Sequence, residues 1–528
     1  VGEQSLFVLA LFFIQLWKEQ SKDKQTLLSN LMKNDEVKNI LLDETPWVMD
    51  AKNETERKQR LATLFDVNDL ESKTSLWSKK LCEYQTEEGG YAWFKGMNAS
   101  RHTTLFVIDN FGRLKKNGID VSNDLVAVEK AIHFLDDEIR KDLEWEKKHN
   151  KSYPKNILIS SSQLYYFQVR SLFPEIKFEA GTKEAYRFYY DLMEKQWKDF
   201  SLYGKALAAI ALHRGGDIAT AKYIIRSLRE HSTTNEDFGM YWQKNISGYS
   251  WQDAAISTHT RIMEALQIVD PQQEEQDELR IWLLNQKRTQ NWDNVIATID
   301  ALNVLLQKDS DWLSKENKVN IQLGGKAIVP NDAEAGTGYF SATISGEKVT
   351  PRMGRIDLSS EEGGNMSWGA VYWQFEEELE KVVSDKTGLH IEKEMKLETI
   401  EKGQTVLTKI GDKTKLMVGD KLVVRLTLRT DRDLEYVSLK DQRASCTEPL
   451  QQLSGYRCSE HTCYYQSVKD AAMYYFFDHL SKGTYVFEYR LWITNEGDFT
   501  NGITTVQCLY APEFSSNTGS VRLHVGKQ

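Results

Sequence analysis

The chain opens with Val1-Gly2-Glu3-Gln4, followed by the apolar run Ser5-Leu-Phe-Val-Leu-Ala-Leu-Phe-Phe-Ile-Gln-Leu-Trp17. Gly2 permits a flexible start and Glu3 is an acidic residue suited to a first helical turn, so this stretch predicts a helix start. The run is shorter than the roughly 20 residues that a membrane-spanning helix needs. Because it is apolar on nearly all sides, we expect it to be the central helix of a larger helical body.

Length and charge narrow the class of protein. A chain of 528 residues is too long for one hydrophobic core, so several domains are expected. The formal net charge of −10 is spread along the sequence without a basic stripe, which argues against nucleic acid and against an anionic membrane as partners. Because the chain opens on Val1 beside a core helix, without a signal peptide, we expect it to be part of a longer protein.

Helical periodicity dominates residues 1–312. The connections are short, so helices that are neighbours in sequence should be antiparallel neighbours in space. Asp217 stands where an N-cap is needed. The predicted helices are Ser5–Lys18, Lys24–Asn34, Glu54–Leu64, Leu70–Tyr84, Arg101–Lys115, Asp124–Lys148, Ile157–Phe173, Lys183–Trp197, Leu202–His213, Ile218–Glu230, Ile256–Val269, Asp277–Gln286 and Val295–Lys308.

A weak internal repeat runs through this helical part: a Gly or polar turn leads to a tryptophan, and a new apolar helix follows. We interpret it as a helical hairpin that recurs around a ring, with each tryptophan wedged between hairpins. Small residues in Leu202–His213 allow close helix approach, as in an inner ring. An α/α toroid accounts for these features, and an ordinary helical bundle is the alternative. The tryptophans of the repeat are Trp93, Trp242, Trp251 and Trp292.

Helical spacing stops after Lys308, and a small β module is predicted at residues 313–386. Its predicted strands are Val319–Leu323, Ala342–Ser345 and Met366–Gln374, which are separated by Gly-rich turns.

The last part, residues 387–528, is predicted to be a β-sandwich because short strands and turns alternate evenly along it. In Val418–Leu428, leucine and valine alternate with mostly polar residues, as in a half-buried strand. The other predicted strands are Leu434–Leu439, Thr484–Ile493, Thr504–Tyr510 and Val521–Val525.

Gly2-Glu3-Gln4 at the mouth of a buried helix resembles the Cys-x-Glu-Gln thioester motif of alpha-macroglobulin and complement proteins. In that family the Cys thiol and the Gln side chain join as a reactive internal thioester. Val1 stands at the Cys position and has no sulfur. The resemblance therefore implies a degenerate thioester site at Val1, Glu3 and Gln4, and a chance match of three residues is the alternative.

Longer stretches resemble the bacterial branch of the alpha-macroglobulins. The resemblance implies an α/α toroid thioester-type domain at 1–312, a β module packed on it at 313–386, and a C-terminal macroglobulin-like sandwich at 387–528. The stretches that resemble the thioester domain are Glu44-Thr45-Pro46-Trp47, Asn53–Phe65, Ser201–His213 and Gly239-Met-Tyr-Trp242. Those that resemble the terminal sandwich are Lys482–Arg490, Gly497-Asp-Phe499 and Cys508-Leu-Tyr-Ala-Pro512.

This resemblance implies a protein that is not an enzyme, needs no cofactor or metal, and inhibits endopeptidases. Such proteins are extracytoplasmic and often lipid-anchored in the periplasm, here through an anchor outside this chain. They enclose an attacking protease after it cleaves a bait segment, so proteases are the expected partners, with cell-envelope proteins as a further option. With Val1 in place of Cys, capture would be by enclosure alone, or the fold would serve another partner.

Tyr510 is the residue that the resemblance marks in the sandwich. In the bacterial family, a tyrosine in such a stretch lies against the thioester region and shields it. Pro512 ends the strand that precedes it, which places the Tyr510 ring where it can reach a neighbouring domain. We therefore interpret Tyr510 as a domain lock, and a packing role inside the sandwich is the alternative.

Two further residue groups have competing interpretations. Cys458 and Cys463 could belong to a metal knuckle. Zinc is usually bound by four ligands and no second pair lies nearby in the sequence, so a disulfide across a hairpin tip is favoured. A polysaccharide lyase also combines a toroid with sandwiches. The acidic net charge disfavours an acidic polymer as its substrate, and a lone histidine in an apolar helix is usually a core residue. The residues weighed for the lyase are Asn245, Tyr249, His259 and Arg261.

Overall fold

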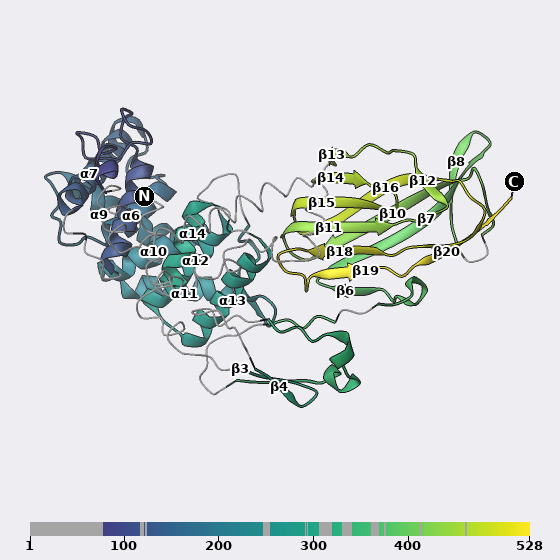
Figure 1. Ribbon diagram of the computed structural model, residues 1–528. Coiled ribbons are helices and arrows are strands. Elements are labelled where there is room, and N and C mark those ends of the chain that lie inside the picture. The colour runs from purple at the N-terminus through teal and green to yellow at the C-terminus, as the bar shows by residue number, and fades with distance from the viewer. Residues whose placement is uncertain are drawn as a thin grey trace.

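Helices and sheets occupy separate parts of the protein. Figure 1 shows the helices at one end, two large sheets at the other, and a small β module beside the junction. The helices predicted before residue 70 lie outside the described residues, as do Val1, Glu3 and Gln4. The computed structural model describes residues 78–116, 121, 124–246, 254–290, 292, 294–305, 319–329, 341–360, 369–373, 376–411, 414–459 and 462–527.

Helix α10 (Leu202–Gly215) lies at the centre of the helical part, where it packs against α8 (Ser161–Arg170), α11 (Ile218–Glu230) and α12 (Ala255–Val269). Its small residues make this possible, because Gly204 and every alanine of the helix are buried. Side chains this short let neighbouring helix backbones approach closely, as expected for an inner helix.

Local capping residues fix the ends of these helices. The side chain of Ser201 accepts a hydrogen bond from the amide of Gly204 at the start of α10, and Gly216 ends the helix with φ +96°. Asp217 caps the next helix through the amide of Thr220, which confirms its predicted role. The other named helices are α6 (Arg101–Lys116), α7 (Leu125–His149), α9 (Thr182–Gln196), η2 (Trp197–Asp199), α13 (Gln273–Thr289) and α14 (Val295–Leu305).

Most of the helix predictions that fall on the described residues are confirmed to within one or two residues. The helix predicted at Ile157–Phe173 begins later, because Ser160 and Gln163 form a reciprocal capping box. The helix predicted at Asp277–Gln286 begins earlier, at Gln273, where acidic residues in the first turn suit a helix start.

The tryptophan repeat is confirmed only in part. Trp242 is buried, and its indole donates a hydrogen bond of 2.8 Å to the carbonyl of Leu228. It follows Gly239, whose φ of +66° and contact with the backbone of α13 leave no room for a Cβ. Trp93, in contrast, is 55% exposed, so its side chain is not wedged between hairpins.

The small module contains β3 (Val319–Leu323), β4 (Lys326–Ile328) and β5 (Ile356–Ser360), ordered β4-β3-β5. The strand predicted at Ala342–Ser345 is wrong: the segment is irregular and leads into short helices. Residues 369–373, inside the third predicted strand, are also irregular. A short apolar alternation forms a strand only when a partner completes the hydrogen-bond ladder. The short helices are η4 (Gly346–Lys348), η5 (Pro351–Gly354) and, after the module, η6 (Leu379–Lys381).

The C-terminal part consists of two large antiparallel sheets that share one core. The five-stranded sheet has the order β12-β16-β10-β7-β8, and the seven-stranded sheet β13-β14-β15-β11-β18-β19-β6. A small sheet, β17-β20-β9, completes this part. The strands are β6 (Asp385–Thr387), β7 (Leu389–Glu401), β8 (Gln404–Lys409), β9 (Leu416–Met417), β10 (Lys421–Thr430), β11 (Leu434–Gln442), β12 (Thr447–Pro449), β13 (Gly455–Cys458), β14 (Cys463–Val468), β15 (Ala472–Leu480), β16 (Gly483–Ile493), β17 (Gly497–Asn501), β18 (Thr504–Cys508), β19 (Ser515–Asn517) and β20 (Val521–Gly526).

Alternation along the strands builds this core. Arg425, on the outer face of β10, pairs with Glu488 of β16. The residues on either side of Arg425 face inward, since the period of two residues puts the apolar set on one face, as the sequence predicts. The β10 side chains in the core shared by the two sheets are Leu422, Val424, Leu426 and Leu428.

Candidate functional site

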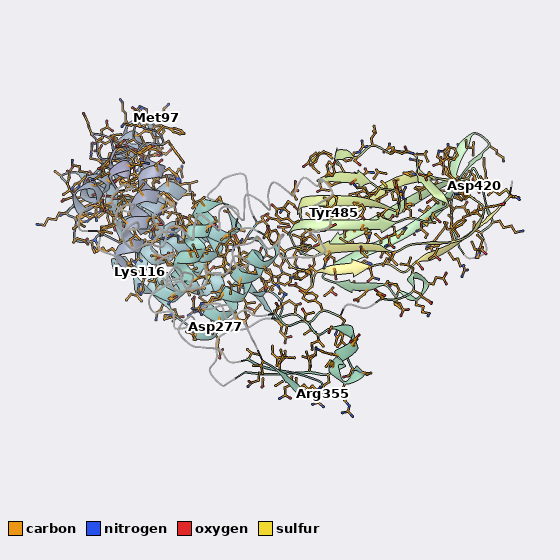
Figure 2. The ribbon with its side chains drawn as sticks, in the orientation of Figure 1. Met97, Lys116, Asp277, Arg355, Asp420 and Tyr485 are labelled. Carbon is orange, nitrogen blue, oxygen red and sulfur yellow. A yellow bond between two sulfur atoms is a disulfide. The ribbon has the colours of Figure 1, made fainter. Side chains whose placement is uncertain are left out.

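The strand register shows which loops of the sandwich face the helical part. Thr430 at the end of β10 pairs with Gly483 at the start of β16. Cys508 at the end of β18 pairs with Val437, near the start of β11. Figure 2 places Tyr485, near the start of β16, at the end of the sandwich that faces the helices. The loop that follows Cys508 therefore lies at this end.

Tyr510 lies in this loop and packs on its own sandwich. Its ring meets the ring of Tyr436 edge to face, with centroids 5.0 Å apart, and the side chain is half-buried against the sandwich core. The packing role weighed for Tyr510 thus has direct support. Its role against the thioester region stays a prediction, because Val1, Glu3 and Gln4 lie outside the described residues.

Glu513, further along the same loop, joins the sandwich to both other parts of the chain. One carboxylate oxygen forms an ion pair with Arg288 of α13, and the other accepts a hydrogen bond of 2.9 Å from the hydroxyl of Tyr372. Tyr372 belongs to the segment 369–373 of the module. Arg288 lies in the last turn of its helix, where a cation is favoured by the carbonyl end of the helix dipole.

Stacked cations and rings extend this contact. The guanidinium carbon of Arg432, in the loop between β10 and β11, lies 4.5 Å from the ring centroid of Phe238 in the helical part and 4.5 Å from that of Phe514. Arg288 also approaches Phe514, at 5.4 Å. Cation–π contacts of this kind are worth about 0.5–2 kcal/mol each, depending on how far water is excluded.

The junction is only partly shielded from water. The side chain of Arg288 is 32% exposed and that of Glu513 is 19% exposed, so solvent screens the attraction between them. Burial, reinforced by the charge of Glu513, raises the pKa of Tyr372, which keeps its hydroxyl protonated and able to donate. The residues that meet here, called the junction cluster below, are Phe238, Arg288, Tyr372, Arg432, Glu513 and Phe514.

The junction cluster could not be foreseen from the sequence. Its residues come from separate segments, and each segment alone shows only a surface charge or a ring. The one local signal is Pro512, which ends the strand and marks the loop, and it pointed to Tyr510 alone.

The residues weighed for a lyase serve the packing of the helical part. His259 is fully buried, stacks on Trp282 with centroids 4.1 Å apart, and forms a hydrogen bond of 3.0 Å between Nε2 and the carbonyl of Leu279. Burial lowers the pKa of His259 to about 3, so it stays neutral. Asn245 donates to a backbone carbonyl, and Tyr249 lies outside the described residues.

Arg261 belongs to a buried ion network that ties three helices together. It donates to Asp109 of α6 at 2.7 Å and to Glu264 of its own helix at 3.0 Å. Arg113 of α6 donates to Asp300 of α14 at 2.6 Å. Burial alone would raise the pKa of Asp109, but Arg113 and Arg261 outweigh it and hold that pKa well below its usual range. These charges compensate one another, as buried charges must.

The cysteines of the described residues fall into two kinds. Cys458 and Cys463 are opposite each other on β13 and β14 and are joined by a disulfide, with Cα atoms 4.1 Å apart. Cys82 is an exposed thiol, whereas Cys446 and Cys508 are buried. Burial raises the pKa of each buried thiol to about 11, which makes both poor nucleophiles.

Neither a metal-ligand cluster nor a membrane-length apolar helix occurs among the described residues. No group of three or more His, Cys, Asp or Glu side chains there is arranged to hold a metal ion. No helix in this part of the chain combines the length and apolarity that crossing a bilayer requires.

Comparison with protein families gives one match. Residues 388–513 match the model of the bacterial alpha-2-macroglobulin MG10 domain. This range runs from the start of β7 to Glu513, so it covers most of the two large sheets and includes Tyr510.

Solved structures give weaker likenesses, each at 14% identity and over 89% of this chain. They are Escherichia coli alpha-2-macroglobulin activated by porcine elastase (TM-score 0.38), the trypsin-activated E. coli protein (0.39), and Salmonella alpha-2-macroglobulin reacted with methylamine (0.32). The chain spans 39%, 30% and 28% of their lengths, respectively. Among curated proteins, no match was found.

Proposed function

We propose that the chain belongs to the alpha-macroglobulin family, because residues 388–513 match a bacterial alpha-2-macroglobulin MG10 domain, and that it takes part in trapping endopeptidases by conformational enclosure. The MG10 match is the observation that carries this function. The chain spans well under two thirds of the length of the solved alpha-2-macroglobulins named above. The activity of the whole protein is therefore also part of the proposal.

The proposed protein is an inhibitor and not an enzyme. In support, His259 is neutral and held by Leu279, and Arg261 is neutralised inside the buried ion network. Neither side chain has the access that a general base or a substrate-binding cation needs. The helical part would be the α/α toroid of the family, and its thioester position would be inert because Val1 has no sulfur.

The proposed location is outside the cytoplasm, where a protease inhibitor meets its targets. The disulfide between Cys458 and Cys463 supports this location, because disulfides persist in oxidising compartments and are rare in the cytosol. A lipid anchor would lie outside this chain.

The test uses the complete product of the encoding gene. It is incubated with trypsin or porcine elastase, and the protease is then assayed on a large protein substrate and on a small chromogenic peptide. Enclosure predicts that cleavage of the large substrate falls while cleavage of the peptide persists, because only small molecules reach a trapped protease. If both substrates are cleaved equally well with and without the protein, enclosure is wrong.

A further inference from the structure

β8 forms one edge of the five-stranded sheet of the sandwich. It pairs with β7 on one side, and among the described strands none pairs with its other side. The strand at the opposite edge of the sheet, β12, is short and contains Pro449, a residue that discourages further strand pairing. β8 contains no proline, carries its one charge, Lys409, at its end, and is mostly exposed. This edge is therefore open to a further strand.

The hairpin that joins β7 to β8 fixes which backbone groups of β8 point outward. Glu401 pairs with Gln404 across a tight turn, and the amide of Ile410, just after β8, donates to the carbonyl of Met395 in β7 at 2.9 Å. Hydrogen-bonded residues alternate along an antiparallel strand, so the even-numbered residues of β8 bond to β7. The residues whose N–H and C=O groups point away from β7 are Thr405, Leu407 and Lys409.

The outer face of the sheet is apolar beside this edge. Leu407 is 42% exposed, and Ile400, its diagonal neighbour on β7, is 78% exposed. Glu398, which pairs with Leu407 in register, forms an ion pair on the same face with Arg490 of β16. Leu407 and Ile400 thus form a small apolar patch at the rim of a charged face, next to backbone groups that can accept a strand.

We propose that β8 pairs with β8 of a second copy of the chain, so that the two five-stranded sheets join into one sheet around a twofold axis. A twofold axis perpendicular to a sheet makes the joined strands antiparallel and keeps matching faces on the same side. The odd-numbered residues of the two strands can then exchange their outward N–H and C=O groups. One register places Leu407 opposite Leu407 of the second copy, and Thr405 opposite Lys409 of the second copy.

This register makes a second copy a suitable occupant of the edge. The two leucines meet on the axis with Ile400 of each copy nearby, so the apolar patch is covered. Lys409 lies opposite the neutral Thr405, so no like charges face each other. In a parallel pairing in register, Lys409 would lie beside Lys409 of the second copy.

The position of β8 leaves room for this pairing. Figure 1 shows β8 at the end of the sandwich that is far from the helices. Because the joined strands are antiparallel, the helical parts of the two copies would point in opposite directions. The contact is small, so we expect an association that depends on concentration rather than a permanent dimer. The inference does not depend on the proposed protease capture.

Sedimentation velocity of the whole chain over a range of concentrations tests the pairing. The wild type should populate monomer and dimer in a ratio that depends on concentration. Thr405→Glu should lower the dissociation constant several-fold, because each new carboxylate lies opposite Lys409 of the other copy. Thr405→Lys is the matched variant at the same exposed position, and its two like-charge pairs should raise the dissociation constant several-fold.

Leu407→Pro tests the backbone contact. Proline removes the outward N–H of this residue, whereas the bonds between β7 and β8 use other residues, so the hairpin should persist while the dimer is lost. Hydrogen exchange of the Val406 and Thr408 amides, which point to β7, checks that the hairpin is intact.

Three outcomes would overturn the pairing. The first is a wild-type chain that stays monomeric at every concentration, which is also the result expected if the edge serves a strand of another protein. The second is that Thr405→Glu and Thr405→Lys leave the dissociation constant unchanged or shift it in the same direction. The third is a dimer that survives in Leu407→Pro. If that variant loses the hairpin, the two Thr405 variants decide.

Discussion

The buried ion pair of the sandwich allows a quantitative prediction. Lys393 of β7 and Asp441 of β11 belong to different sheets, and their side chains are 2% and 0% exposed. Asp441 also accepts hydrogen bonds from the hydroxyls of Tyr489 and, at 2.7 Å, Thr504. Nζ of Lys393 donates to the carbonyl of Gln442 at 3.0 Å. Every polar atom of the pair is thus engaged between the sheets.

Lys393→Met keeps most of the side-chain volume and removes the only cation that pairs with Asp441 among the described residues. Breaking a buried pair by removing one partner costs about 3–5 kcal/mol, because the remaining charge stays buried without compensation. Arg425→Met is the matched control on the same sheet. Its pair with Glu488 is 43% and 39% exposed, so its loss should cost about 1 kcal/mol or less.

The assay is hydrogen exchange of the β10 and β16 amides in the whole chain, which reports the free energy of opening of the sandwich. Lys393→Met should lower that free energy by about 3–5 kcal/mol, and the further change Asp441→Leu should recover part of the loss by removing the stranded charge. A loss of less than about 1 kcal/mol in Lys393→Met would refute the reasoning, since it would mean that water reaches Asp441.

Four further predictions concern single sites. The pKa of His259 is about 3 in the folded protein, below its unfolded value of about 6.5, so the stability that the neutral side chain provides is full above pH 6.5 and is lost as pH falls toward 3. His259→Gln should therefore make the unfolding free energy of the helical part less dependent on pH in that range. An unchanged pH dependence would contradict the lowered pKa of His259. Replacing Cys458 and Cys463 by alanine should cost about 2 kcal/mol or less, because the closed loop is short, and peptide mapping without reductant should find the two linked in exported protein; free thiols there would contradict the disulfide. Methylamine should leave the intact mass unchanged, and an adduct at Gln4 would show that a thioester forms after all. Tyr510→Ala should enlarge the radius of gyration without unfolding either large part, at a cost of about 2 kcal/mol in the contact; an unchanged radius would mean that the ring serves only the sandwich.

Regular elements followed from the sequence where a repeating pattern and a local cap agree. Leu202–Gly215 is an example, since its small residues, Ser201 and Gly216 all favour one helix with fixed ends. β10 is another, since its alternation matches a strand that is buried on one face. Ala342–Ser345 shows where this fails: the same alternation over four residues is too short to form a strand without a partner.

The candidate site could not be predicted in the same way. Whether Arg288 meets Glu513 depends on how two separately folded parts lie against each other, and no local pattern encodes that. The family resemblance led to Tyr510 because it concerns the loop after β18. Glu513 in the same loop is identified only by its contacts with Arg288 and Tyr372, which the structure shows. His259 is the converse case: the apolar residues around it in the helix already favoured a core role, and its burial agrees.

Ion pairs inside the helical part and the sandwich are buried, whereas the ion pair between these two parts is partly exposed, so each part should stay rigid while the contact between them can open. Inside the helical part, Asp109 and Arg261 are each 2% exposed, and inside the sandwich Lys393 and Asp441 are no more exposed. Such pairs are costly to break, because each partner would be left in a dry interior. Between the parts, the ion pair is partly solvated, and the contacts around it are the hydrogen bond from Tyr372 and stacked rings and guanidinium groups, which separate at a modest cost. The proposed enclosure of a protease by moving whole domains needs this difference: each domain must keep its fold during the motion, and the junction between the domains must open.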